Sequence, residues 1–152
     1  MGRDEAQLMA KDPLLDIADC KVVEANASRA VVEQPAAPEL ANHMGARHAG
    51  ALFSVGYAAS RALVASAIGP NSKQAEAQMV ESEVIYEKVA GAETVAATAE
   101  PGGEDWRAQL TTVSEGGAAD LQTAVTLRNE DEKTIMVMSV RWQVDSSTGS
   151  SG

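Results

Sequence analysis

Residues 49–68 read AGALFSVGYAASRALVASAI, and this stretch decides the fold. Its apolar and small residues recur at steps of three and four, which predicts one long α-helix. The remaining positions are also mostly small or apolar, so we expect the helix to be covered on most sides. Its length approaches a membrane span, but Arg61 and the many Ala, Gly and Ser residues favour a buried helix. The following Gly69-Pro70-Asn71 ends it.

Segments with strand character lie on both sides of this helix. Two precede it, at residues 19–25 and 28–33, and residues 34–47 form a loop. Residues 106–113 are compatible with a strand or a short helix. Four further strands follow the long helix, at residues 78–89, 94–99, 121–128 and 134–144, and the last two predict an antiparallel hairpin. One long helix covered by an antiparallel sheet is an α+β arrangement.

The chain of 152 residues is predicted to be a single domain. Hydrophobic residues make up 45% and charged residues 22%, which excludes a mainly disordered chain. We expect an N-terminal segment at residues 1–17, the folded domain at residues 18–145 and a flexible Ser/Gly tail at residues 146–152. One sheet over one helix leaves exposed edges, and dimerisation through a sheet edge is the usual remedy.

Charge and residue usage exclude several classes of protein. The net charge is −10, no basic run occurs and aromatic residues make up only 3%, so nucleic-acid binding is not expected. Cys20 is the one cysteine, which excludes an internal disulfide and a cysteine zinc cluster. His43 and His48 lack a nearby third ligand, so no metal site is expected. The N-terminus lacks the apolar run of a signal peptide, and we expect a cytoplasmic protein that does not associate with a membrane.

The stretch that carries chemistry leads into the long helix. It reads NHMGARH over residues 42–48 and holds both histidines of the chain. Free backbone N–H groups and the positive end of the helix dipole meet here, so this point can hold an anion or a developing oxyanion. The side chains of Asn42, His43, Arg47 and His48 supply further donors. In the alternative interpretation, Asn42 and His48 only cap the loop and the helix end.

The run from Asn42 to Phe53 has the pattern Asn-His-x-Gly-x-x-His-Ala-Gly-Ala-Leu-Phe. Followed by a long Ala-rich helix and four strands, it resembles the hotdog-fold thioesterase superfamily, most of all its PaaI-type branch and the uncharacterised thioesterase-like proteins close to it. The resemblance covers roughly residues 18–144. It implies a sheet wrapped around the helix, a homodimer or a tetramer, and an acyl thioester, usually of coenzyme A, in a cleft between subunits. Coenzyme A would enter as part of the substrate, and no other cofactor is implied.

The resemblance also assigns roles to residues around the helix start. The backbone N–H of Ala49, which follows the motif histidine His48, would polarise the thioester carbonyl. Asn42 matches a polar residue that positions this carbonyl or the attacking water. Gly50 matches the second small residue of the motif, and it is expected to line the substrate site together with Gly45.

Tyr57 departs from the family pattern. The family places an Asp or Glu nine residues after the motif histidine, as base or nucleophile, and Tyr57 stands there instead. Arg61 follows one turn later, and no Asp or Glu occurs between residues 42 and 74. A tyrosine hydroxyl is a poor base at neutral pH. Either Tyr57 and Arg61 hold an anionic or carbonyl-bearing ligand, with Arg47 as a further substrate-binding residue, or Arg61 reaches a carboxylate while Tyr57 packs alongside.

Three functions stay open on these grounds. The first is an acyl-CoA thioesterase with an altered mechanism. The second is a non-catalytic binding protein for an acyl-CoA or another small carboxylate. The third is an enzyme of changed chemistry in which Tyr57 acts as an acid. The missing carboxylate favours the second and third, while Asn42, His48 and the small residues at the helix start favour the first.

Overall fold

The computed structural model describes residues 20–36, 46–69, 76–91 and 93–145. The predicted N-terminal segment and the Ser/Gly tail lie outside these residues, as do Asn42, His43 and Gly45. The helices and strands follow one another as β1 (Lys21–Ala25), β2 (Ala30–Gln34), α3 (Ala49–Ile68), β3 (Glu76–Tyr86), β4 (Val95–Pro101), α4 (Trp106–Ser114), β5 (Ala118–Arg128) and β6 (Thr134–Asp145). The long helix therefore begins and ends where the sequence predicts.

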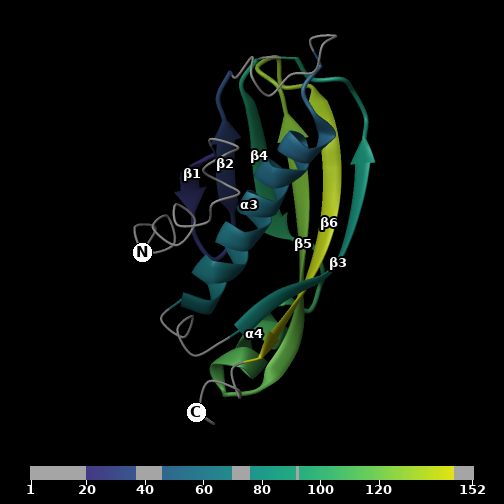
Figure 1. The fold of residues 1–152 in the computed structure, drawn as a ribbon. Helices are drawn as coiled ribbons and strands as arrows, with labels where there is room; N and C mark the ends of the chain where they lie inside the picture. Colours follow the sequence, from purple (N-terminus) through teal and green to yellow (C-terminus); the bar gives the residue numbers. More distant parts are fainter. Residues whose placement is uncertain (1–19, 37–45, 70–75, 92, 146–152) are drawn as a thin grey trace.

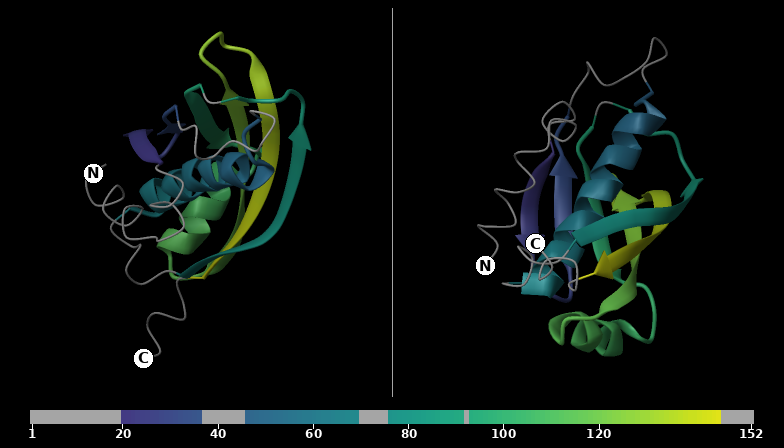
Figure 2. Two further views of the ribbon diagram at one scale, coloured as in Figure 1. Left: turned by 45° about the horizontal axis from the view of Figure 1, so that its top comes forward. Right: turned by 60° about the horizontal axis from the view of Figure 1, so that its bottom comes forward.

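Within the described residues, six strands form one antiparallel sheet that curves around α3 (Figure 1). Their order across the sheet is β1-β2-β4-β5-β6-β3, so β1 and β3 are its edges. Helix α3 lies across the concave face and packs chiefly on β2, β4 and β5, whereas α4 lies at one end of the sheet (Figure 2). The predicted α+β architecture, an antiparallel sheet wrapped around one long central helix, is confirmed.

Small side chains let α3 approach the sheet closely. Ala58 and Ala62 are fully buried. At Gly56 an added Cβ would lie only 2.9 Å from Cε of Met136 and 2.9 Å from Sδ of Met138, so the ends of two β6 side chains lie directly against the helix at this position. By length and composition α3 could cross a membrane, yet most of it is buried within the fold. Burial against the sheet therefore accounts for its apolar character.

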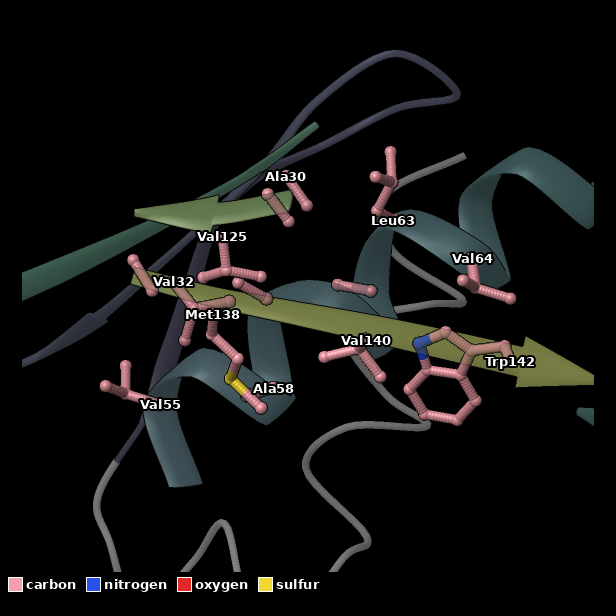
Figure 3. Packing of buried hydrophobic residues seen from close by; sticks show 14 of the residues in the cluster. Ala30, Val32, Val55, Ala58, Leu63, Val64, Val125, Met138, Val140 and Trp142 are labelled. Atoms are coloured by element: carbon pink, nitrogen blue, oxygen red, sulfur yellow. The ribbon is translucent and has the colours of Figure 1, made fainter. Parts of the chain in front are cut away.

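The core lies between α3 and the concave face of the sheet. Buried and less buried residues alternate along most of β5 and β6, which places one row of side chains from each strand inward. In Figure 3, Met138 and Val140 of β6 point toward α3, where Val55 and Ala58 lie. These contacts set the rotation of α3 over the sheet, and hence which of its residues face away from it.

A bulge in β3 changes the predicted faces of this strand. The sequence alternation predicts Val80 on the same face as Ser82 and Val84. In the structure, the pairing of β3 with β6 shifts just after Met79, which lies opposite Trp142. One extra residue in a strand moves the preceding side chains to the opposite face. The prediction for Val80 is therefore wrong: Met79 takes the inward position, and Val80 is 41% exposed.

Candidate ligand site at the start of helix α3

The start of α3 is anchored by Arg47. Its Nη1 donates to Oε1 of Gln34 on β2 (3.0 Å), and its Nη2 donates to the main-chain oxygen of Glu93. The backbone N–H of Arg47 donates to the oxygen of Ala90 (2.6 Å). Gln34 in turn donates from Nε2 to the oxygen of Ala51 in the first turn of α3 (3.2 Å). These bonds tie the helix start to β2 and to the connection between β3 and β4.

Arg47 and Gln34 form a buried pair that the sequence does not reveal. Gln34 is fully buried and ends β2, where the sequence predicts the beginning of a loop. Arg47 is only 5% exposed, and desolvation lowers the pKa of its guanidinium, an effect that the negative charge of Glu93 partly offsets. Among the described residues, its Nε has no hydrogen-bond partner. The structure thus places Arg47 inside the fold beside the helix start, and its contact with substrate stays a prediction.

The first turn of α3 presents backbone donors that have no acceptor among the described residues. His48 is the N-cap in an extended conformation (φ −60°, ψ 140°), its carbonyl accepts from the N–H of Ala51 (3.0 Å), and its exposed side chain makes no capping hydrogen bond. Ala49 and Gly50 are exposed, and nothing in the described part of the chain accepts from their N–H groups. Free donors at the positive end of a helix dipole can bind a carbonyl oxygen or an anion.

Tyr86 also lies at the helix start, and sequence reasoning did not include it in the site. Its hydroxyl donates to the oxygen of Ala49 (3.2 Å), which joins the end of the edge strand β3 to the first turn of α3. Tyr86 is 46% exposed. The alternation of side chains along β3 places Tyr86 on the inner face of the sheet, and this alternation is the sequence signal that points to it. Its meeting with Ala49 depends on how α3 crosses the sheet.

Tyr57 and Arg61 lie on a face of α3 that the sheet leaves partly uncovered. We call Gly50, Phe53, Tyr57 and Arg61 the open face of α3; Gly50 is exposed and the other three are half-buried. Tyr57 is seven positions after Gly50, so the two are nearly in line and about 10 Å apart along the helix axis. The predicted carbonyl-binding end and the predicted acid position therefore belong to one surface.

Tyr57 packs on Trp142 of β6. Their ring centroids are 5.8 Å apart, and the ring planes are inclined by 35°. The indole Nε1 donates to Oγ of Ser60 (2.7 Å), which in turn shares a hydrogen bond of 2.6 Å with Oγ1 of Thr123 on β5. Helix α3 carries no acidic residue. The backbone N–H groups at its start can bind a carbonyl group, but the helix supplies no carboxylate of its own to activate water.

Metal-binding side chains are not clustered in the part of the chain that the structure describes. No group of three or more His, Cys, Asp or Glu residues in this part could hold a metal ion.

Asn42 and Gly45, which complete the predicted site, lie outside the described residues. Of the predicted site residues, the structure therefore brings His48, Ala49 and Gly50 together at the helix start.

Comparisons with known proteins concern nearly the whole chain. Residues 5–144 match the family described as "Domain of unknown function (DUF4442)". No curated protein matches the sequence. A crystal structure from Pseudomonas aeruginosa, described as a protein of unknown function and probable thioesterase, is similar with a TM-score of 0.78, at 18% identity over 94% of each chain.

Two further solved structures are thioesterases by description. A hypothetical thioesterase from Streptococcus pneumoniae, solved with coenzyme A, has a TM-score of 0.70 at 14% identity, over 91% of this chain and 94% of that one. A thioesterase from Haemophilus influenzae has a TM-score of 0.74 at 11% identity, over 96% of this chain and 92% of that one. At such identities the similarity shows the fold alone, and it confirms the hotdog fold.

Proposed function

This chain belongs to the DUF4442 family of domains of unknown function, and from its site we propose that it binds acyl thioesters of the coenzyme A type at the start of α3. The observation that carries the proposal is the exposed first turn, where the N–H groups of Ala49 and Gly50 have no acceptor among the described residues. A thioester carbonyl would accept from the Ala49 N–H and align with the helix dipole. The relative from S. pneumoniae that was solved with coenzyme A supports this ligand class.

The open face of α3 favours binding over efficient hydrolysis. Hydrolysis of a thioester needs a group that takes a proton from the attacking water. The position that the family resemblance assigns to this group holds Tyr57, whose ring packs on Trp142. A thioesterase with an altered mechanism is the second candidate, which the exposed His48 beside the Ala49 N–H favours.

We further propose that the protein is a cytoplasmic homodimer joined through β3. This edge strand has 11 residues, whereas the opposite edge strand β1 has 5. Val80, Ile85 and Tyr86 on β3 are 41%, 54% and 46% exposed. A long edge with exposed apolar side chains favours pairing with the same edge of a second copy. Because Tyr86 contacts Ala49, such a dimer would bring the partner close to the helix start.

The variant Ala49→Pro tests the ligand site. Proline lacks the N–H, but it is well tolerated at the first helical position, where the N–H has no intrahelical acceptor. The preceding His48 already has the extended conformation that a residue before proline prefers. Ala49→Gly keeps the N–H and is the matched control.

The measurement is isothermal titration calorimetry with butyryl-CoA. We expect the wild type and Ala49→Gly to bind, and Ala49→Pro to bind about tenfold more weakly, because one hydrogen bond to the ligand is lost. Equal affinity of the two variants, or no binding by the wild type, would contradict the proposal. Release of free thiol in the same samples distinguishes a hydrolase from a binding protein.

A further inference from the structure

Three buried polar groups from three elements meet beneath Tyr57. They are the indole N–H of Trp142 on β6, the hydroxyl of Ser60 on α3 and the hydroxyl of Thr123 on β5, joined by bonds of 2.7 and 2.6 Å. Ser60 and Thr123 are completely buried, and Trp142 is 3% exposed. A rotated member would be left unpaired in the interior, at a cost comparable to a lost hydrogen bond. The network therefore holds the indole in one orientation.

An apolar side chain could fill the space of Trp142 without any hydrogen bond to the hydroxyl groups of Ser60 and Thr123. Figure 3 shows the indole on β6, with Val64 of α3 and Val140 of β6 near it in this view, and all three side chains belong to the buried hydrophobic cluster. Apolar packing alone would tolerate more than one ring orientation, whereas the bond from Nε1 to Ser60 selects one. The surface that Trp142 presents to its neighbours is therefore set by a directional bond.

Tyr57 carries this orientation to the open face. Its ring lies within the range of direct aromatic contact with Trp142, at 5.8 Å between centroids. Tyr57 is half-buried, so part of the phenol is accessible. Side chains of an α-helix lean toward its N-terminus, which directs Tyr57 toward Gly50 on the same face. Through its contact with Trp142, the phenol thus connects the buried network to the face of α3 that also carries Gly50.

We propose that Trp142 is a positioning residue for ligand binding and acts through Tyr57. Held by Ser60 and Thr123, the indole keeps the phenol of Tyr57 in place. The Tyr57 hydroxyl then hydrogen-bonds the part of the acyl thioester that continues from the helix start along the open face. This inference rests on the proposed function. It makes Ser60, which does not touch the ligand, a determinant of affinity.

The chain contains two tyrosines, Tyr57 and Tyr86, so protein labelled with 3-fluorotyrosine gives two fluorine NMR resonances, which Tyr57→Phe assigns. Ser60→Ala removes the acceptor of the indole N–H. Ser66→Ala is the matched control: this serine is also buried on α3, and its Oγ has no partner among the described residues. Without ligand, we expect Ser60→Ala to shift the Tyr57 resonance and leave that of Tyr86 in place, while Ser66→Ala leaves both unchanged.

Titration with butyryl-CoA gives the second readout. We expect the dissociation constant to rise about tenfold in Ser60→Ala, through the displaced phenol, and to stay at the wild-type value in Ser66→Ala. Trp142→Phe keeps an aromatic ring without the N–H, and it is expected to shift the Tyr57 resonance as well, which provides a second test where Ser60→Ala folds poorly.

The outcomes separate this inference from the proposed function. A Tyr57 resonance that stays in place in both Ser60→Ala and Trp142→Phe would overturn the inference, whatever the ligand does. Binding of butyryl-CoA by the wild type with unchanged affinity in these variants would overturn the inference alone. No binding by the wild type would overturn the proposed function and, with it, the role of Trp142 in ligand binding.

Discussion

Replacing each of the three buried serines of α3 by alanine is expected to change stability in three different ways. Ser54, Ser60 and Ser66 are 5%, 0% and 3% exposed, and they lie on one helix. The substitution removes the same hydroxyl group at each position. Differences among the variants therefore report what each hydroxyl binds to, because helix propensity and burial are nearly constant across the series.

Ser66 and Ser54 are expected to tolerate the change. The Oγ of Ser66 has no partner among the described residues, and a buried unpaired hydroxyl costs about 1–3 kcal/mol. Ser66→Ala therefore raises stability by about 1 kcal/mol, or roughly 2–4 °C in Tm for a chain of this size. Ser54 donates to the oxygen of Gly50 one turn earlier (2.8 Å). Since this local bond duplicates a helix contact, Ser54→Ala changes stability by less than roughly 0.5 kcal/mol.

Ser60→Ala is expected to be strongly destabilising. It leaves the indole N–H of Trp142 and the hydroxyl of Thr123 without their shared partner in the interior. At about 1–3 kcal/mol for each of these two groups, the loss is about 2–6 kcal/mol, or on the order of 10 °C in Tm. Adding Thr123→Val removes one of the two unpaired groups, so the double variant recovers part of the loss.

The assay is calorimetric melting with urea unfolding of all variants at one protein concentration, since the Tm of a dimer depends on concentration. The expected order of stability is Ser66→Ala first, then the wild type with Ser54→Ala, and Ser60→Ala last. The reasoning is refuted if Ser66→Ala melts below the wild type or if Ser60→Ala melts with it. Either result would mean that hydrogen-bond pairing does not govern these buried hydroxyl groups.

Three other predictions concern assembly, chemistry and metals. Sedimentation at micromolar concentration is expected to show about twice the chain mass of 15.8 kDa, because the β3 edge is exposed, and a clean monomer would contradict the dimer. Tyr57→Glu with Arg61→Thr is expected to raise thiol release from butyryl-CoA by roughly 10²–10⁴-fold, since a carboxylate then stands on the open face without a guanidinium to pair with it. Tyr57→Gln with Arg61→Thr is its control, and no gain over this control would refute the assignment. A chelator is expected to leave Tm unchanged, because metal-binding side chains are not clustered in the described residues; a loss restored by zinc would show otherwise.

The long helix α3 shows where local sequence suffices, and α4 shows where it does not. The bounds of α3 follow from its periodicity and from Gly69, which has a positive φ of 66° at the helix end. Residues 106–113 remained ambiguous because a short apolar pattern fits a strand or a helix. The structure makes them the helix α4, with Trp106 and Val113, seven residues apart on one helix face, buried. Packing at the end of the sheet decided between the two.

At the candidate site, local sequence predicts some positions, but long-range contacts decide the others. Ala49 and Gly50 could be placed at a helix start, and Tyr57 with Arg61 on one face, from spacing alone. The inward direction of Arg47 could not, because its partners Gln34 and Glu93 lie 13 and 46 residues away in the chain. Such contacts leave no local pattern in the sequence.

By itself, the sequence determined the bounds of the long helix and the approximate positions of the strands, that the central helix is covered on most sides, and that this helix contains no acidic residue. These are properties of neighbouring residues. Only the tertiary structure decided that Tyr86 meets Ala49 and that Trp142 supports Tyr57. Such meetings depend on strand register and on the crossing of α3, and a single extra residue after Met79 is enough to reverse the faces of a strand.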